Sequence, residues 1–97
     1  MISLNYKMKR EGKIMKEKFI LMNSEAMFKD GVPVIRYIGY IKGTDENFMF
    51  FIDFDFWNQI FYEYDGDERL ADDACIKYAM NKREHYNIDI ERSEFYE

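Results

Sequence analysis

Residues 48–56 read FMFFIDFDF, and this segment is the strongest strand signal in the chain. Alternate side chains point to opposite faces of a strand. One face is entirely apolar and comprises Phe48, Phe50, Ile52, Phe54 and Phe56. The other face mixes rings with carboxylates and comprises Met49, Phe51, Asp53, Asp55 and Trp57. The segment therefore predicts a strand whose first face lies in a core and whose second face is at least partly in water.

The residues before this segment predict further strands. Residues 18–22 form a short apolar run, and residues 34–41, VIRYIGYI, are rich in the β-branched and aromatic residues that favour strands. Residues 23–28 are expected to form a helical turn or a loop. Residues 29–31, KDG, predict a tight turn, because Asp and Gly tolerate a positive φ. Residues 43–47 form a polar connector.

Residues 58–64, directly after the segment, fit two patterns. Ile60, Tyr62 and Tyr64 alternate as they would in a strand. Ile60 and Tyr64 also share a helical face with Trp57 and Phe61. A fourth strand, or a bent extension of the third, is the preferred interpretation, and a helix is the alternative. Asp-Gly-Asp at 65–67 ends the segment in either case.

Residues 68–84 predict a helix. Its apolar stripe recurs at the 3.6-residue period and contains Leu70, Ala71, Ala74, Cys75, Tyr78 and Ala79. Asp65 and Glu68 have capping-box spacing, and His85 lies with other bases near the last turn, where it suits the helix dipole. Residues 86–91 alternate again and predict a closing strand. Together these elements predict an α+β fold with a small antiparallel sheet of about four to five strands and one amphipathic helix, 68–84, packed on one face.

The length and the charge distribution suggest one domain with a separate start. The chain has 97 residues and a formal net charge of −5, and this length fits a single domain. Residues 1–14 are interpreted as a basic arm or a translated leader, because codons for Arg-Glu-Gly at 10–12 can resemble a ribosome-binding site upstream of Met15. Residues 15–97 are expected to form a single α+β domain. Frequent residues with A/T-rich codons point to a low-GC bacterium, or to a phage or mobile element within one.

Several classes of protein are excluded or disfavoured. No apolar run approaches the roughly 20 residues that span a bilayer, and the lysine-rich start lacks the features of a secretory signal. Cys75 is the single cysteine, which excludes an internal disulfide. A buried thiol in the reducing cytoplasm is therefore expected. The sequence has no Gly-rich phosphate loop and no paired-cysteine zinc spacing, so no cofactor is expected.

The residues that could carry catalysis have simpler explanations. Asp53 and Asp55 would lie about 6–7 Å apart on one strand face, but a cation site needs more oxygen ligands. Cys75 and His85 would lie about 15 Å apart along the helix, too far for a catalytic dyad. Residues 37–39, YIG, match half of the GIY-YIG nuclease signature, and the other half is absent. We expect a protein without enzymatic activity or a metal.

The acidic segment in the middle of the chain, residues 44–74, requires a functional explanation. Residues 44–74 hold ten acids, and Arg69 is the only base among them. Such a surface repels a phosphate backbone, which disfavours direct nucleic-acid binding, but it attracts a protein with a basic groove. Tyr and Trp are the residues enriched at interface hot spots. The expected partner-binding residues are Asp53, Asp55, Trp57, Tyr62, Glu63, Tyr64, Asp65, Asp67, Glu68, Asp72 and Asp73.

Two functions are consistent with this surface. The first is a small acidic inhibitor that occupies the nucleic-acid groove of a nuclease or defence enzyme by charge mimicry, in the general manner of anti-CRISPR, anti-restriction and immunity proteins. The second is a structural module that self-associates or docks through exposed aromatic residues. Salt separates them, because binding through charge weakens steeply as salt screens it.

Overall fold

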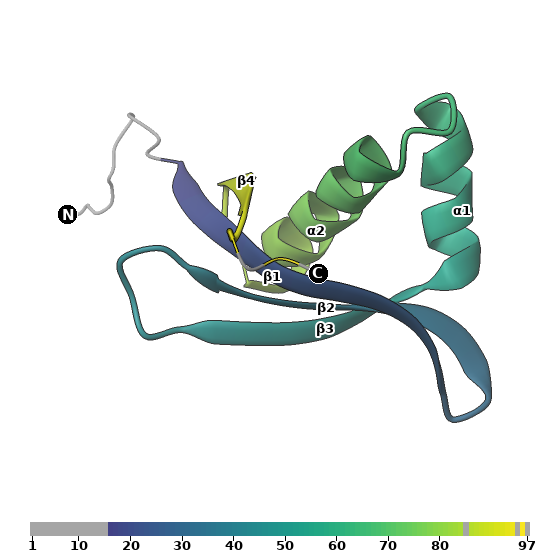
Figure 1. Ribbon diagram of the computed structural model, residues 1–97, viewed down its shortest axis with the longest axis horizontal. Coiled ribbons are helices and arrows are strands. Elements are labelled where there is room, and N and C mark those ends of the chain that lie inside the picture. The colour runs from purple at the N-terminus through teal and green to yellow at the C-terminus, as the bar shows by residue number, and fades with distance from the viewer. Residues whose placement is uncertain (1–15, 85, 95, 97) are drawn as a thin grey trace, which may run out of the picture.

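The computed structural model describes residues 16–84, 86–94 and 96. In these residues the chain forms a four-stranded mixed sheet and two helices, within the α+β class that the sequence predicts. The elements in chain order are β1 (Glu17–Lys29), β2 (Val32–Ile41), β3 (Asn47–Asp53), α1 (Phe54–Glu63), α2 (Glu68–Glu84) and β4 (Ile88–Arg92). Both helices lie on the same side of the sheet (Figure 1). The arm or leader expected at 1–14 and the expected role of His85 lie outside the described residues.

The strand order is β3-β2-β1-β4, and the sheet is mixed. β2 pairs antiparallel with both β1 and β3. β4 runs parallel to β1, with Ile88 beside Glu17 and Arg92 beside Leu21. The prediction of an antiparallel sheet is therefore wrong for this pair. The direction of β4 follows from α2, which returns the chain to the end of the sheet where β1 begins, and residues 86–91 carry no signal of that direction.

The β1–β2 hairpin confirms the predicted turn and corrects the predicted loop. Asp30 and Gly31 form the turn with φ of 53° and 80°, the left-handed backbone that tight hairpins require. Residues 23–28 are not a helical turn or a loop, because β1 continues through them as far as Lys29. The register shifts once, between Leu21 and Asn23, and then continues unbroken along β2. Pairing with the strongly strand-forming residues of β2 overrides the weak strand propensity of this stretch.

The chain changes from strand to helix at Asp53, earlier than the alternation predicts. The Asp53 side chain accepts a hydrogen bond from the Asp55 N–H at 2.8 Å and caps α1. The strand prediction for 48–56 is therefore confirmed only as far as Asp53, and residues 54–56 are helical. The strand interpretation of 58–64 is also wrong, and its helical alternative is confirmed for residues 58–63. The described residues accordingly form two helices, whereas the sequence predicts one.

The predicted bounds of α2 are confirmed, but its cap and its buried stripe differ from the prediction. Asp67 caps the helix by accepting from the Leu70 N–H at 3.1 Å, whereas Asp65 lies outside the helix with φ of 57°. Leu70 and Tyr78 from the predicted stripe are exposed. The residues of α2 that are buried in the core are Ala71, Cys75, Ile76, Ala79 and Met80. The buried stripe is thus rotated towards Ile76 and Met80, and Tyr78 lies at its edge, where its ring centroid is 5.0 Å from that of Phe56 in α1.

The core lies between the sheet and α2, and aliphatic side chains in it surround the rings of Phe19, Tyr37 and Phe50. Tyr37, Phe19 and Leu21 are among its largest fully buried side chains. The Phe50 ring lies 5.7 Å from that of Tyr37 and 6.3 Å from that of Phe19. Gly39 of β2 lies beneath Phe19, and a Cβ there would meet Phe19 Cε1 at 2.4 Å and the Ile20 carbonyl oxygen at 2.5 Å. The triplet at 37–39 thus has a role in packing.

Alkaline pH is expected to destabilise the fold through two buried groups. Burial, reinforced by the Asp72 carboxylate, raises the pKa of the Cys75 thiol from its ordinary 9.0 to about 12. Burial, followed by the hydrogen bond to Asp72, raises the pKa of Tyr37 well above its usual range. The folded protein therefore keeps both protons at a pH where the unfolded chain loses them. Stability is fully present below about pH 9, and each group lowers it by about 1.4 kcal/mol per pH unit above its unfolded pKa, which is 9.0 for Cys75 and 10.0 for Tyr37.

Urea unfolding between about pH 7 and about pH 10.5 measures this effect. The Cys75→Ala variant serves as the control, because it lacks the thiol and should lose the part of the slope that begins near pH 9. A free energy of unfolding that stays constant across this range in the parent protein would contradict the expected burial of both groups.

Candidate partner-binding surface

Residues 62–70 join α1 to α2, and we refer to them as the elbow. The elbow lies at the outer end of the two helices, away from the sheet (Figure 1). It begins in the last turn of α1, passes through the left-handed residues Asp65 and Gly66, and ends in the first turn of α2. The structure thus brings together the central group of predicted partner-binding residues, namely Tyr62, Glu63, Tyr64, Asp65, Asp67 and Glu68.

The acids of the elbow are exposed and lack cationic partners. None of the ion pairs within residues 16–84, 86–94 and 96 involves Glu63, Asp65, Asp67 or Glu68. Asp67 and Glu68 suit the N-terminus of α2, where the helix dipole favours negative charge. Glu63 lies in the last turn of α1, which holds no base, so its charge opposes that dipole. The stability of the helices therefore explains only part of this acidic surface.

Large apolar groups are exposed between these acids. Tyr62 is 70% exposed, Tyr64 is 42% exposed and Leu70 is 45% exposed. Exposed rings within a charged rim resemble the centre of a protein interface, where Tyr is enriched. The helical periodicity of residues 68–84 predicts that Leu70 lies in the core. With Asp67 recognised as the cap, Leu70 falls in the first turn of α2, which leaves it at the surface of the elbow.

Asp53 and Asp55 lie apart from the elbow, at the opposite end of α1. Both side chains are exposed. The helix has 10 residues, so its two ends are separated by about 15 Å. Asp53 also caps α1. These two acids therefore flank the elbow at a distance and form no compact cluster with it.

Asp72 and Trp57 have partners inside the protein. Asp72 Oδ1 accepts a hydrogen bond from the Tyr37 hydroxyl at 2.5 Å and another from Trp57 Nε1 at 2.8 Å. This one oxygen thus connects β2, α1 and α2. The Trp57 ring is half-buried and stacks between Phe54 and Phe61, at 5.8 Å and 5.0 Å. Asp72 and Trp57 therefore position α1, and with it the elbow.

Asp73 also has an internal partner. Its carboxylate forms an ion pair with Arg92 Nη1 at 3.0 Å, and both side chains are largely buried. The pair joins α2 to β4 on the helix side of the sheet. The sequence showed Asp73 only as part of an acidic run, because the position of Arg92 beside it depends on the parallel pairing of β4.

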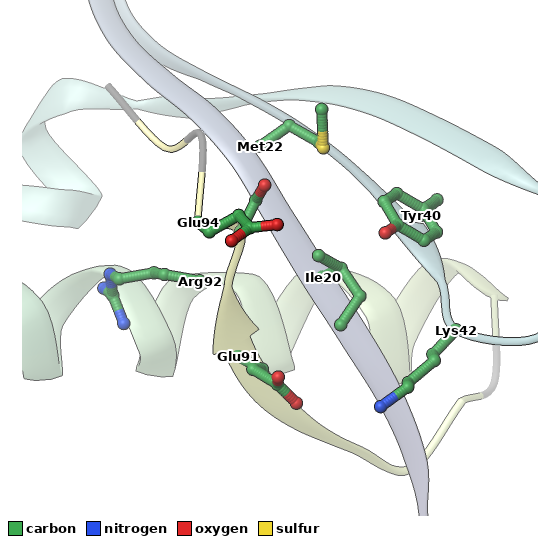
Figure 2. Close-up of a pocket in the computed structure, with 8 residues that line it drawn as sticks. Ile20, Met22, Tyr40, Lys42, Glu91, Arg92 and Glu94 are labelled. Atoms are coloured by element: carbon green, nitrogen blue, oxygen red, sulfur yellow. The ribbon is translucent and has the colours of Figure 1, made fainter.

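A pocket lies on the opposite side of the sheet, which neither α1 nor α2 covers (Figure 2). Ile20, Met22 and Tyr40 supply apolar surface to it, and its charged groups have both signs. Its lining residues are Ile20, Met22, Tyr40, Lys42, Glu91, Arg92, Ser93 and Glu94. None of the predicted partner-binding residues lies there. Across the described part of the chain, no group of three or more His, Cys, Asp or Glu side chains could hold a metal ion.

Comparison with known proteins finds no family model, no curated protein and no solved structure that matches this chain. Neither helix of the described residues has the length and apolar character to cross a membrane. At the elbow, exposed tyrosine rings lie beside acids that form no ion pair within residues 16–84, 86–94 and 96.

Proposed function

We propose that this protein is a non-enzymatic inhibitor that occupies the basic nucleic-acid groove of a nuclease or defence enzyme by charge mimicry. The observation that carries the proposal is the elbow, where Tyr62 and Tyr64 are exposed among acids without cationic partners. Folding alone favours neither feature, because exposed rings stay in contact with water and like charges repel each other. Both features become favourable when a basic partner covers the surface.

Charge and rings have separate roles in this mechanism. Residues 62–70 contain four acids and one base, so the elbow presents a concentrated negative potential. That potential steers a basic groove onto the elbow and accelerates association. Tyr62 and Tyr64 then act as anchors that slow dissociation. Asp53 and Asp55 supply further charge at the far end of α1, and Asp72, Trp57 and Asp73 hold the two helices in place.

The expected setting is the cytoplasm of a low-GC bacterium, with a phage or mobile element as the source of the gene. Nucleic-acid enzymes present basic grooves there, and defence nucleases are the enzymes that a mobile element must block. The proposed type of action is that of anti-CRISPR, anti-restriction or immunity proteins, with no direct contact to nucleic acid and no membrane partner.

The test is capture of proteins from a low-GC bacterial lysate on the tagged protein at about 0.05 M and about 0.5 M NaCl. The elbow variant combines Glu63→Gln, Asp65→Asn and Glu68→Gln. The control variant combines Asp30→Asn, Asp45→Asn and Glu94→Gln, all at exposed positions outside the elbow. Both variants have the same net charge, and each changes one Asp with a positive φ, Asp65 or Asp30.

We expect a nucleic-acid enzyme to be retained at low salt by the parent and by the control variant. The elbow variant should retain it at least about tenfold less, because steering depends on the local potential. Excess duplex DNA should displace the captured enzyme, since both ligands would use one groove. Capture that survives high salt, duplex DNA or the elbow changes would contradict charge mimicry.

A further inference from the structure

The two edge strands of the sheet differ sharply in composition. β4 is five residues long and reads IDIER, so charged side chains occupy most of its length. β3 is seven residues long and reads NFMFFID, with five consecutive apolar residues between Asn47 and Asp53. Natural edge strands usually carry charges, prolines or bulges that prevent pairing with another chain. β4 has such protection, whereas β3 has neither a charge nor a proline between its ends.

β3 also has the geometry that strand addition needs. Its pairing with β2 runs without a shift from Val34 opposite Asp53 to Tyr40 opposite Asn47. Among the strands that the structure describes, β2 is its only neighbour, so the other edge of β3 carries no ladder. The helices lie over one face of the sheet (Figure 1). The side chain of Met49, in the middle of the strand, points to the opposite face, and this residue is 58% exposed.

We propose that β3 pairs antiparallel with β3 of a second copy of this chain, which joins the two sheets into one. The register of β3 against itself favours a second copy as the partner. A two-fold axis beside Phe50 places Phe48 opposite Ile52 of the second copy and Met49 opposite Phe51. Every apolar residue then meets an apolar residue on the same face of the sheet, as cross-strand pairing favours. At each end Asn47 meets Asp53, so an amide faces the carboxylate and the two Asp53 residues stay apart.

Charges outside the strand oppose this dimer and set its response to salt. Each copy carries a net charge of −5. The proposed register brings Glu46 of one copy toward Asp55 of the other. The Arg83 guanidinium lies 5.9 Å from the Phe50 ring centroid, so the proposed axis beside Phe50 would have a copy of Arg83 near it from each chain. Screening of these like charges should strengthen the dimer, whereas binding through the elbow should weaken in salt.

The first test is sedimentation equilibrium over a roughly hundredfold range of protein concentration at low and high salt. Met49→Lys places a charge on the β3 edge at an exposed position, so the fold should tolerate it. Met22→Lys is the matched control on the same face, because Met22 is 36% exposed and lies in β1, away from that edge. We expect Met49→Lys to raise the dissociation constant of the dimer at least about tenfold and Met22→Lys to leave it nearly unchanged.

The second test measures the register directly. Residues opposite each other in an antiparallel pair have Cβ atoms about 4.5–5.5 Å apart, close to the disulfide range, and diagonal neighbours lie about 7–8 Å apart. A mixture of the Met49→Cys and Phe51→Cys proteins should therefore oxidise to a covalent heterodimer. Either protein alone should cross-link far less. The native Cys75 is fully buried and does not compete.

Three results would overturn the proposal: a monomer at every concentration and salt, a dimer that Met22→Lys dissociates as readily as Met49→Lys, or cross-linking that is equal in the mixture and in the separate proteins. The elbow variant leaves β3 unchanged and should dimerise like the parent. Failure of the dimer therefore leaves the proposed inhibitor function intact, and failure of capture by the elbow leaves the dimer intact.

Discussion

Asp72→Ala is expected to lower the free energy of unfolding by about 3 kcal/mol, or on the order of 15 °C in Tm. The change removes the one oxygen that accepts from both Tyr37 and Trp57. The Tyr37 hydroxyl belongs to a fully buried side chain, so water cannot replace the lost acceptor without a rearrangement of the core. The loss should also free α1, which would change the position of the elbow.

Urea unfolding and the fluorescence of Trp57, the single tryptophan, measure the two consequences. Asp72→Asn is the first control, because its amide oxygen can still accept both hydrogen bonds. The double variant Tyr37→Phe/Asp72→Ala is the second control. The double variant should be less destabilised than the sum of the two single changes, since it leaves no unpaired hydroxyl. A cost below about 1 kcal/mol for Asp72→Ala would show that this network contributes little.

Gly39→Ala is expected to destabilise the protein by about 3 kcal/mol, at the upper end of the usual cost of overpacking. The new methyl group would lie 2.4 Å from Phe19 Cε1 and 2.5 Å from the Ile20 carbonyl oxygen. The ring could rotate to relieve the first contact. The second contact is with backbone in the neighbouring strand, so β1 and β2 must move apart next to their register shift.

Gly43→Ala provides a matched comparison for this prediction. Nothing lies within 4 Å of a Cβ at Gly43, but its φ is +86°, so an alanine there is strained without being crowded. It should cost only about 1 kcal/mol. Phe19→Leu in the Gly39→Ala background should recover part of the loss by vacating the space beneath the ring. Equal Tm values for the two alanine variants would contradict the close approach at Gly39.

The candidate site could be predicted from the sequence only in part. The acids and tyrosines of residues 62–68 were visible as a cluster, and the structure leaves them exposed together. Asp72 and Asp73 belong to the same acidic run, yet they face inward to Tyr37, Trp57 and Arg92. Those partners come from three different elements, and a local charge count carries no information on which elements meet.

Local sequence patterns were sufficient to predict those elements for which periodicity, terminal charges and turn residues all indicate the same structure. Periodicity and terminal charges determined α2, from Glu68 to Glu84, and the Asp-Gly pair determined the β1–β2 turn. The alternation of 48–56 was misleading beyond Asp53, because a strand pattern and a helix cap coincide there. The side-chain hydrogen bond to Asp55 starts the helix, and the packing of Phe54, Trp57 and Ile60 against the core maintains it.

The sequence by itself therefore determined the α+β class, the second helix of the fold and the acidic, tyrosine-bearing character of its surface. Only the tertiary structure decided the parallel direction of β4, the position of β3 at an open edge and the internal role of Asp72. The physical reason is the separation along the chain between the residues that interact. Periodicity, capping and turn chemistry act over a few residues, whereas strand order and buried hydrogen bonds join residues far apart in the chain, such as Tyr37 and Asp72.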